Sequence, residues 1–552
     1  MNPSHSFIPL SPTVFLERSG NAFASRTALI HRGGAVNYAE LRSRSRRLAQ
    51  ALARLHVGYG DKVALLMENG TPTVEAHFAI PALGAVVVML NPWLSPADTL
   101  ELIACSEPKV LIADSATFNA IADAWFATPG PKPAVVISDL RPGEVDARLT
   151  DAQDYETCLR REDDGKPLDA GIRNEMDPIA INFTSGTTGK PKGVTYTHRA
   201  AYLHAIGQIL MIELSRRSRY LWTLPMFHVS GWGHIWANVA AGCTQVIPAT
   251  NAIQGREKEF VGIIRKEQIS HLAGSPRLLR SLMEADERGG ETLRGLTVET
   301  GGAAPPTTLI QHLESCGIRL IHQYGLNETC GPFVVNEEQS DWQQLTADQR
   351  AHMRARQGVA ALHAGTGLRV IDDSGNEVPH DGRSLGEVVM AGNTVATGYY
   401  NNPEATEKGF RNGWFHSGDV AVVHSDGSLE IRDRMKDLIH VETEYGWENI
   451  SSIEIENILC RHGNIRDAAV IAVPGEAAGS SRQLLVAFAE LKDESDLSGQ
   501  AFDAYCKDAL SVYKRPDRIY FSPLPKTSTG KVRKDVLMAD AKRRLAMVED
   551  AA

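Results

Sequence analysis

The sequence lacks long apolar runs, paired cysteines and an excess of positive charge. No apolar stretch approaches the roughly 20 residues of a membrane-spanning helix, and the amino terminus has no basic segment followed by an apolar one, as a secretion signal would. The seven cysteines are scattered, without a C-x-x-C pair or a metal-binding His/Cys spacing. Dispersed thiols of this kind favour a reducing compartment. We therefore predict a cytoplasmic protein without a membrane span.

Acidic residues outnumber basic ones, 67 against 57, which gives a net charge of -10. Nucleic-acid binding depends on clustered positive charge, whereas the basic groups at Arg42–Arg47 and Lys542–Arg544 are better interpreted as solvated helix faces. We therefore expect no nucleic-acid partner. At 552 residues the chain is too long for one hydrophobic core, so at least two domains are expected.

Most of the chain alternates short apolar strands with segments of helical periodicity. This alternation predicts an α/β fold with parallel sheets covered by helices on both faces. The predicted strands include Thr27–His31, Lys62–Met67, Val86–Leu90, Ala134–Ser138, Ile179–Phe183, Tyr220–Leu224, Thr244–Ile247 and Ile269–Ala273, and the predicted helices include Phe15–Phe23, Tyr38–Leu55, Pro72–Leu83 and Thr197–Ile212. We interpret Glu144–Asn174 as a surface connection, and Val359–Asp372 with Gly386–Ala391 as a smaller β-rich subdomain.

The segment after the strand Ile179–Phe183 has the composition of a phosphate-binding loop. It holds four hydroxyl side chains, three glycines and two lysines, and almost no apolar residue. Glycine lets the backbone approach a ligand closely, while hydroxyls, N–H groups and ammonium groups can surround phosphate oxygens. The spacing differs from the G-x-x-x-x-G-K-[ST] loop. The residues predicted to bind polyphosphate are Thr184, Ser185, Gly186, Thr187, Thr188, Gly189, Lys190 and Lys192.

Residue by residue, this loop resembles the phosphate loop of the adenylate-forming (AMP-binding) enzymes. That family includes acyl-CoA and aryl-CoA synthetases, peptide-synthetase adenylation domains and luciferases. Further motifs follow in the order of that family over nearly the whole chain, at Leu296–Pro305, His322–Thr329, Gly413–Asp419 and Pro525–Val532. The stretches Pro225–His228 and Glu448–Glu454 look most like those of medium-chain and aromatic acyl-CoA ligases. The resemblance implies ATP, Mg²⁺ and coenzyme A as cofactors.

The motif His322–Thr329 carries the chemistry expected of a nucleotide site. Tyr324 can stack on a purine, Gly325 leaves room for a bound adenylate, and Glu328 offers the carboxylate oxygens that Mg²⁺ prefers beside phosphates. Asn327 stands where the family usually has Thr or Ser, whose hydroxyl touches the α-phosphate. An asparagine can still donate a hydrogen bond there, but it is longer and branched differently.

Ligands of open α/β sheets bind beyond the carboxyl ends of the strands, which places the glycine turn after Leu296–Thr300 in the same crevice. The resemblance further implies that Asp419 binds the ribose hydroxyls and that Arg434 reaches the nucleotide. The remaining residues predicted to bind the cofactor are Gly302, Ala303, Ala304 and Gln323.

The resemblance also implies two domains, 1–435 and 436–552, the second being small, α+β and mobile. The hinge would lie near 433–437, where Lys436 absorbs the rotation. Lys531 would reach the substrate carboxylate and the α-phosphate, and would stabilise the charge that develops as pyrophosphate leaves. Rotation would then let another face of the small domain build the thiol site.

That other face is where the sequence departs most from the family. The loop at 440–447 is about four residues longer than the usual pattern. It carries Tyr445, Gly446 and Trp447, with the indole where a second glycine is expected. Since glycine there serves close approach to the pantetheine arm, we expect Trp447 to alter that approach or to shield the hinge.

The residues proposed for chemistry and for the acid site come from the same segments. Lys531, Glu328, Asn327 and His228 are the candidate catalytic residues, and Glu328 is also the candidate metal ligand. The acid pocket is predicted from His228, Val229, Trp232, Gly274, Gly301 and Leu326. The small residues in and beside it, including Ala303 and Ala304, favour a bulky or hydrophobic acid.

The predicted activity is an acyl-CoA ligase that converts acid and ATP into acyl-AMP and pyrophosphate, and then transfers the acyl group to CoA. The alternative is that the enzyme performs one half-reaction only, either thioesterification of a preformed acyl-AMP or adenylation for a carrier protein. This alternative arises because the sequence departs from the family at Asn327, where adenylation is normally served, and in the 440–447 loop, where transfer to the thiol is normally served. A carrier protein is the less expected partner, because no carrier segment follows Ala552. A non-catalytic acid binder would have no need of Lys531. A homodimer is possible.

Overall fold

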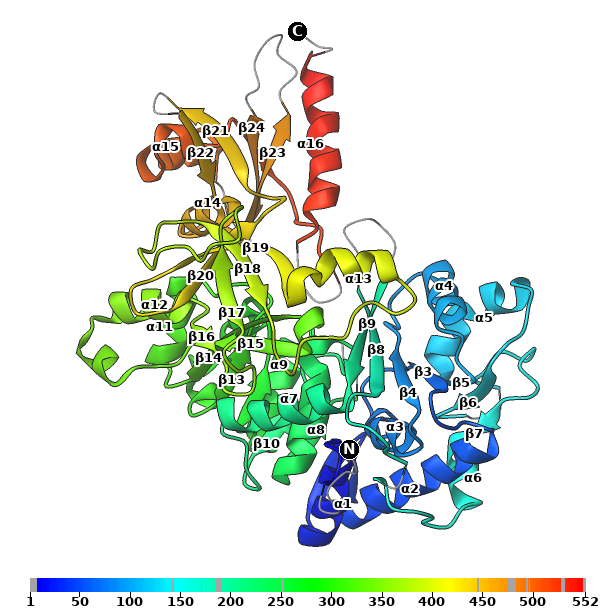
Figure 1. Cartoon of the computed structure of the whole chain (residues 1–552). Coiled ribbons are helices and arrows are strands. Elements are labelled where there is room, and N and C mark those ends of the chain that lie inside the picture. The colour runs from blue at the N-terminus through cyan, green and yellow to red at the C-terminus, as the bar shows by residue number, and fades with distance from the viewer. Residues whose placement is uncertain are drawn as a thin grey trace.

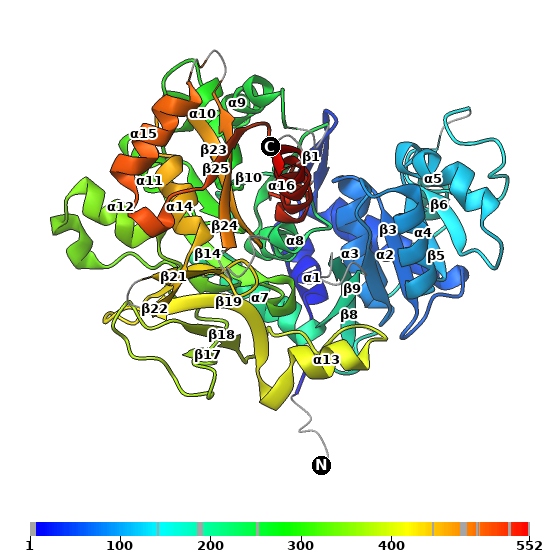
Figure 2. The ribbon, with the colours of Figure 1, turned by 90° about the horizontal axis from the view of Figure 1, so that it is seen from above.

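The computed structural model describes residues 7–140, 143–169, 171–184, 191–249, 253–443, 446–474, 483–492, 495, 497–527 and 532–549. Figure 1 shows a large N-terminal part built of sheets and helices, with a smaller C-terminal part stacked on it. Seen from above in Figure 2, the C-terminal part lies over one half of the N-terminal part. The predicted α/β class is confirmed. Within the described ranges, none of the helices combines the length and apolarity that a membrane crossing requires.

The first sheet has the strand order β7-β6-β5-β3-β4-β8-β9 and is parallel except for the pair β8 and β9. All residues of β4 and β5 are buried, as expected for a sheet covered on both faces. The strands are β3 Lys62–Leu66, β4 Val86–Met89, β5 Val110–Ala113, β6 Ala134–Ile137, β7 Gln153–Asp154, β8 Pro178–Thr184 and β9 Lys192–Thr197, and the accompanying helices are α3 Thr71–Ala82, α4 Pro96–Ser106, α5 Ser115–Ala127 and α6 Tyr155–Arg160.

The second sheet has nine strands in the order β16-β15-β14-β13-β12-β10-β11-β1-β2. Its centre is parallel, and antiparallel pairs at both edges make it a mixed sheet. Its strands are β1 Thr27–His31, β2 Gly34–Asn37, β10 Arg219–Leu221, β11 Thr244–Ile247, β12 His271–Ala273, β13 Thr297–Thr300, β14 Arg319–Leu326, β15 Gly331–Val335 and β16 Val359–Ala360. The α-helices of this region are α1 Thr13–Ala22, α2 Tyr38–Arg54, α7 His198–Met211, α8 Val229–Ala241, α9 Glu257–Lys266, α10 Pro276–Ala285, α11 Thr307–Ser315 and α12 Ala347–Ala355.

Helices between the two sheets join them into one core. Phe78 of α3 and Trp236 of α8 meet edge to face, with ring centroids 4.8 Å apart. They belong to one buried cluster together with Val87 of β4 and Tyr220 of β10, which come from different sheets. The carboxyl ends of strands from both sheets are therefore held in fixed relation to each other.

A four-stranded antiparallel sheet follows, in the order β17-β18-β19-β20, and confirms the β-rich subdomain. Its strands are β17 Leu368–Ile371, β18 Gly386–Met390, β19 Phe415–Val423 and β20 Leu429–Arg434, and α13 is Pro403–Gly409. The C-terminal part contains the hairpin β21 Ile439–Thr443 and β22 Gly446–Ile450, the strands β23 Ile465–Pro474, β24 Gln483–Leu491 and β25 Arg518–Phe521, and the helices α14 Ser452–Leu459, α15 Gly499–Ala509 and α16 Lys534–Glu549.

The prediction of a surface connection at 144–174 is wrong in part. The segment contains the short strand β7 and the helix α6, and Tyr155 and Leu159 on α6 are buried. The Tyr155 hydroxyl donates to the buried Glu75 carboxylate at 2.6 Å, and Glu75 is also paired with Arg44. A helix of six residues is too short to show a clear period in the sequence.

The structure also gives regular form to two segments that the sequence left open. The C-terminal tail after residue 510, for which the sequence predicted no element, includes the strand β25 and the helix α16. The loop at 440–447 is part of a β-hairpin, in which Glu442 pairs with Trp447 and Thr443 with Gly446. Tyr445 lies outside the described residues.

Three buried histidines are expected to make the fold sensitive to acid. Burial lowers the pKa of His77, His198 and His322 from 6.5 to about 4 each. As the pH falls below 6.5, the unfolded chain binds protons that the folded chain does not, so the free energy of unfolding decreases. Each histidine should contribute a loss of roughly 1 kcal/mol between about pH 7.5 and pH 5.5.

Urea denaturation at these two pH values measures this loss. The substitution His322→Gln should reduce the pH dependence, whereas His380→Gln, at an exposed position, should leave it unchanged. A urea midpoint that does not move with pH in the parent protein would contradict the expectation.

Candidate functional site

Tyr324, Asp419 and Arg434 lie together although they are far apart in the sequence. Asp419 and Arg434 are opposite each other on β19 and β20, and the Arg434 Nε lies 3.2 Å from Asp419 Oδ1. The Tyr324 hydroxyl, at the end of β14, donates to Asp419 Oδ2 at 2.7 Å. Asp419 is only 4% exposed. Each carboxylate oxygen has a second lone pair, so Asp419 can still accept from ribose hydroxyls.

Burial, with the adjoining Asp419 carboxylate, raises the pKa of the Tyr324 phenol well above 10. The hydroxyl therefore remains a donor near neutral pH. This bond fixes the ring of Tyr324, and a fixed aromatic ring is a suitable surface for a purine. The structure thus places Tyr324, which we predict to stack on the purine, in contact with Asp419, which we predict to bind the ribose.

A second group lies near the phosphate loop. Glu328, in the single turn Asn327–Thr329 that follows β14, accepts a hydrogen bond on Oε1 from the Tyr399 hydroxyl at 2.8 Å. The Lys192 ammonium, at the start of β9, lies 4.9 Å from the centre of the Tyr399 ring. Tyr399 therefore connects the candidate metal ligand with a lysine of the phosphate loop. The sequence did not single out this tyrosine.

The described residues that flank the phosphate loop support its position. Thr184 ends β8 and is the register partner of Lys192 on β9. Tyr400 donates its N–H to the Gly193 carbonyl at 2.6 Å, so the turn after Gly398 is tied to β9. Residues 185–190 lie outside the described ranges, as does Lys531.

His228 caps the N-terminus of α8. Its Nδ1 accepts from the Ser230 N–H at 3.2 Å and lies 2.7 Å from Ser230 Oγ. The preceding loop is held by Asn182 of β8, which donates to the Phe227 carbonyl at 3.1 Å. The segment with His228 therefore lies beside the strand that leads into the phosphate loop. Trp232, predicted as a pocket residue, is fully buried on α8.

Three glycines predicted in the site have packing neighbours of their own. A Cβ on Gly325 would collide with the Gly331 carbonyl across the β14–β15 pair. On Gly301 it would lie 2.6 Å from Gln323 Nε2, and on Gly274 2.8 Å from a methyl group of Leu278. The space beside these glycines is therefore occupied by protein. This weakens the argument that the small residues leave room for a bulky acid.

The glycine turn after β13 is open by comparison. Gly302 has a φ of 77°, and a Cβ there would meet no heavy atom within 4 Å. Ala303 is exposed and Ala304 half-buried. Val229 is 8% exposed and Leu326 half-buried, and Lys436 is exposed at the predicted hinge.

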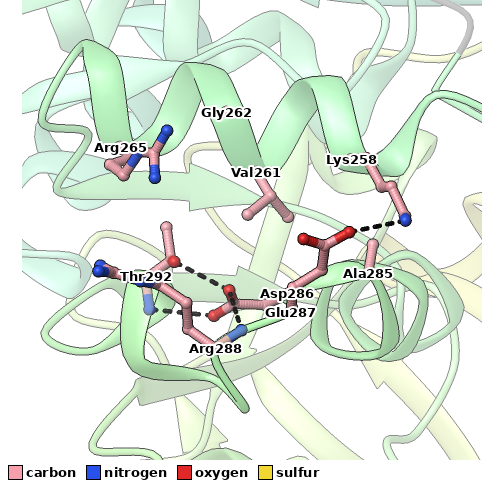
Figure 3. A pocket seen from close by; sticks show the side chains of 9 residues that line it. All are labelled: Lys258, Val261, Gly262, Arg265, Ala285, Asp286, Glu287, Arg288 and Thr292. Carbon is pink, nitrogen blue, oxygen red and sulfur yellow. Dashed lines mark hydrogen bonds and ion pairs between the residues drawn. The ribbon is translucent and has the colours of Figure 1, made fainter.

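A surface hollow of about 280 Å³ lies elsewhere, between α9 and the segment after α10. Figure 3 shows its lining, which contains none of the predicted site residues. Lys258 pairs with Glu287 at 2.8 Å, and the Asp286 carboxylate accepts from the N–H groups of Arg288 and Thr292. These groups stabilise their own loop, so we assign the hollow no role.

A model described as AMP-binding enzyme matches residues 16–400, and one described as AMP-binding enzyme C-terminal domain matches residues 454–531. The chain belongs to the AMP-binding enzyme family. The predictions of an adenylate-forming family and of an AMP-forming acid–CoA ligase are confirmed.

One relative of this AMP-binding enzyme is the peroxisomal trans-cinnamate:CoA ligase of Petunia hybrida. The two are 34% identical over 555 residues, which cover 97% of this chain and 95% of the relative. The fold is that of an anthranilate CoA ligase, AuaEII, solved with anthranoyl-AMP, at a TM-score of 0.83 and 23% identity, covering 99% and 100% of the two chains.

A third similar protein is the o-succinylbenzoate coenzyme A synthetase of Bacillus subtilis, whose structure holds ATP and a magnesium ion. The TM-score is 0.74 at 24% identity, and the match covers 94% of this AMP-binding enzyme and 98% of the other chain. ATP and Mg²⁺ are thus bound within the same fold. The acids named for the three proteins differ, so the family does not determine the acid.

Proposed function

We propose that this AMP-forming acid–CoA ligase performs both half-reactions. In the first, a carboxylate oxygen of the acid attacks the α-phosphorus of ATP and pyrophosphate leaves. In the second, the sulfur of CoA attacks the acyl carbon, AMP leaves with the C–O bond electrons, and the thiol proton is released. The grouping of Tyr324, Asp419 and Arg434 supports this proposal most directly, because these contacts bring together, from three strands, the residues proposed to bind the nucleotide.

The adenosine would be held by that group. Asp419 accepts the ribose hydroxyls, and Tyr324 presents its ring to the purine. The Arg434 guanidinium offsets the charge of the buried carboxylate, which would be costly to bury alone. Gly302 adds an open backbone turn at the end of β13.

Glu328 is the residue we propose for Mg²⁺. Among the described residues there is no cluster of three or more metal-ligating side chains, which agrees with the preference of Mg²⁺ for one or two carboxylates together with substrate phosphates and water. The second oxygen of Glu328 remains available when Tyr399 donates to the first. When bound there, Mg²⁺ would neutralise charge on the phosphates.

We propose 1–435 and 436–552 as the two domains, with rotation at 433–437. Asp433 is 2% exposed and accepts from the Ser452 N–H at the start of α14, at 2.6 Å. This bond crosses the proposed boundary, so a rotation about Lys436 has to break it. The bond therefore belongs to one of two domain arrangements, and Lys531 would serve adenylation in one of them.

The alternative of one half-reaction keeps a specific basis in Asn327 and in the hairpin β21–β22. Asn327 is half-buried next to Glu328, where it has to meet the α-phosphate. A carrier protein as acceptor is a further variant of this alternative. We also propose a cytoplasmic location, from the seven dispersed cysteines.

Acid-dependent exchange of pyrophosphate into ATP tests the first half-reaction. A CoA-thioester assay, supplied either with acid and ATP or with ready-made acyl-AMP, tests the second. We expect exchange, and thioester from both supplies. Thioester from acyl-AMP alone would show that adenylation has been lost and would favour the alternative.

A further inference from the structure

A cluster of charged and polar side chains lies where the C-terminal part meets the boundary proposed at 433–437. The Lys534 ammonium, at the start of α16, pairs with Glu456 Oε1 of α14 at 2.8 Å and also contacts the Ser452 hydroxyl. The Ser452 N–H in turn donates to Asp433 Oδ2 at 2.6 Å. The side chains of Lys534 and Glu456 are only 21% and 18% exposed, and the other two residues are buried. We call Lys534, Glu456, Ser452 and Asp433 the Lys534 cluster.

The cluster contains two carboxylates and one ammonium group. Burial, and to a smaller degree the Asp433 carboxylate, raises the pKa of Glu456. The two carboxylates therefore act on each other, and like charges repel more strongly away from bulk water. Burial opposes the charge of Lys534, but the Glu456 and Asp433 carboxylates outweigh it and raise the pKa of the lysine. The ammonium group thus remains charged and offsets the repulsion between Asp433 and Glu456.

The cluster connects the two proposed domains. Asp433 belongs to β20, whereas the other three residues belong to the C-terminal part. Beside the cluster, the Ser451 hydroxyl donates to the Arg432 carbonyl, and Arg280 of α10 donates to the Arg466 carbonyl of β23 at 2.5 Å. A rotation at the proposed hinge would break the contact of α14 with Asp433. Attraction between Lys534 and Asp433 therefore favours the arrangement that the structure shows.

Lys534 is also close in sequence to the candidate catalytic residue Lys531, which it follows by three residues. Val532, directly after Lys531, pairs with Lys526 in an isolated bridge. The Lys526 ammonium is held by Asp467 Oδ2 of β23 at 2.6 Å. The described residues on both sides of Lys531 are therefore fixed to the small domain, so the position of that domain determines where they lie.

The orientation of the small domain agrees with a role in adenylation. In Figure 1, α16 begins at the end of the C-terminal part that faces the N-terminal part, while the hairpin β21–β22 lies farther away. Figure 2 shows the same helix nearly along its axis, as expected for a helix that points toward the N-terminal part. This is the direction that Lys531 needs in order to reach the nucleotide.

We propose that Lys534 is a positioning residue for adenylation. It holds Asp433 against α14 and so keeps the small domain in the arrangement that presents Lys531 to the nucleotide. Glu456 acts in the opposite sense, because its charge repels Asp433 and makes the arrangement easier to leave. This inference rests on the proposed function, in which Lys531 serves the first half-reaction only.

Removing the cation should slow adenylation selectively. Lys534→Met leaves the Glu456 and Asp433 carboxylates facing each other without an ammonium group, so the adenylation arrangement becomes less populated. We expect kcat of pyrophosphate exchange to fall about tenfold or more, with KM for ATP within about threefold of the parent value, because Lys534 binds no substrate. Thioester formation from ready-made acyl-AMP should stay within about threefold of the parent rate.

Removing the carboxylate of the same ion pair should have a different effect. Glu456→Gln keeps an acceptor for the Val470 N–H, which Glu456 binds at 2.8 Å, and it leaves Lys534 free to attract Asp433. Exchange should therefore stay within about threefold of the parent rate, while transfer to CoA should slow by about threefold to tenfold. Equal losses in both half-reactions for both variants would show a structural ion pair and overturn the inference.

Two further variants control for charge and for location. Lys534→Arg keeps the positive charge and should restore exchange to within about fivefold of the parent rate. Lys514→Met removes another partly buried lysine, which pairs with Glu454 of α14 at 2.6 Å, and should change neither half-reaction. The assays use the full-length chain with benzoate, trans-cinnamate and butyrate, and with the corresponding acyl-AMPs.

Hydrogen exchange of the Ser452 amide tests the inference without substrate. This N–H is bonded to Asp433 in the arrangement seen here, so its exchange rate measures how often the cluster opens. We expect exchange at least about tenfold faster in Lys534→Met and slower than the parent rate in Glu456→Gln, with unchanged rates for the amides of β24. Faster exchange throughout β24 in both variants would show a structural role and overturn the inference.

The outcomes distinguish this inference from the proposed function. If Lys534→Met does not fold, Glu456→Gln decides alone, and a Ser452 amide that exchanges as fast as in the parent protein overturns the inference. If the parent protein shows no pyrophosphate exchange with any acid, the proposed function fails, and the amide rates still decide the inference. Both half-reactions in the parent, with one Ser452 rate in all variants, would refute the role of Lys534 alone.

Discussion

Replacing Lys531 by alanine is expected to lower the rate of acyl-AMP formation by about 100- to 1000-fold. Negative charge develops on the phosphate oxygens as pyrophosphate leaves, and one preorganised cationic donor at such a position contributes a factor of this size. The family resemblance assigns that role to Lys531, in the motif Pro525–Val532. Pyrophosphate exchange at saturating acid and ATP measures the step directly.

The same substitution should leave the second half-reaction within about threefold of the parent rate, because in the proposed mechanism Lys531 acts only in the adenylation arrangement of the small domain. Thioester formation from ready-made acyl-AMP measures this. The matched control is Lys492→Ala, which removes an exposed lysine of the same domain and should change neither rate. Unchanged pyrophosphate exchange in Lys531→Ala would refute the proposed mechanism.

A substitution in the hairpin β21–β22 should instead affect transfer to CoA and spare adenylation. Trp447→Gly, on β22, is expected to alter transfer to CoA while adenylation stays near the parent rate. The two variants together distinguish a full ligase from an enzyme that retains one half-reaction, because each acts on a different step.

The elements that carry the nucleotide motifs were predictable because their signals are local. The strand from Ile179, the glycine turn after Thr300 and the motif with Tyr324 each combine a short apolar run with polar residues at its end. The structure gives β8, β13 and β14 at these places. Whether a polar motif follows directly on the end of a strand depends only on neighbouring residues, so it can be predicted from the sequence.

The contacts between motifs were not predictable, because they depend on pairing between distant segments. Tyr324 and Asp419 are 95 residues apart, and Gln208 and Glu299 are 91 apart. Their meeting follows from the order of strands in the sheets and from the register of β19 with β20. Glu299 was visible as a charged residue inside a predicted strand, which is a signal for buried polar contacts such as the one with Gln208.

Substitution of Asp419 is expected to have the second large effect on activity. Asp419→Ala should lower kcat/KM for ATP by about 100-fold. The change removes the proposed acceptor of the ribose hydroxyls, and it also leaves the Tyr324 hydroxyl and the Arg434 guanidinium without their carboxylate. Initial rates of exchange over a range of ATP concentrations give the value.

Tyr324→Phe is the control that separates the loss of the Tyr324–Asp419 hydrogen bond from the loss of the carboxylate itself. It removes one hydrogen bond to Asp419 but keeps the aromatic ring and the carboxylate, so kcat/KM for ATP should fall by less than about tenfold. The double variant should lose less than the product of the single losses, because Tyr324 and Asp419 are in contact and the alanine has already broken their bond. Strict multiplicativity would show that the bond has no part in nucleotide binding, and Asp419 would then act on the ribose alone.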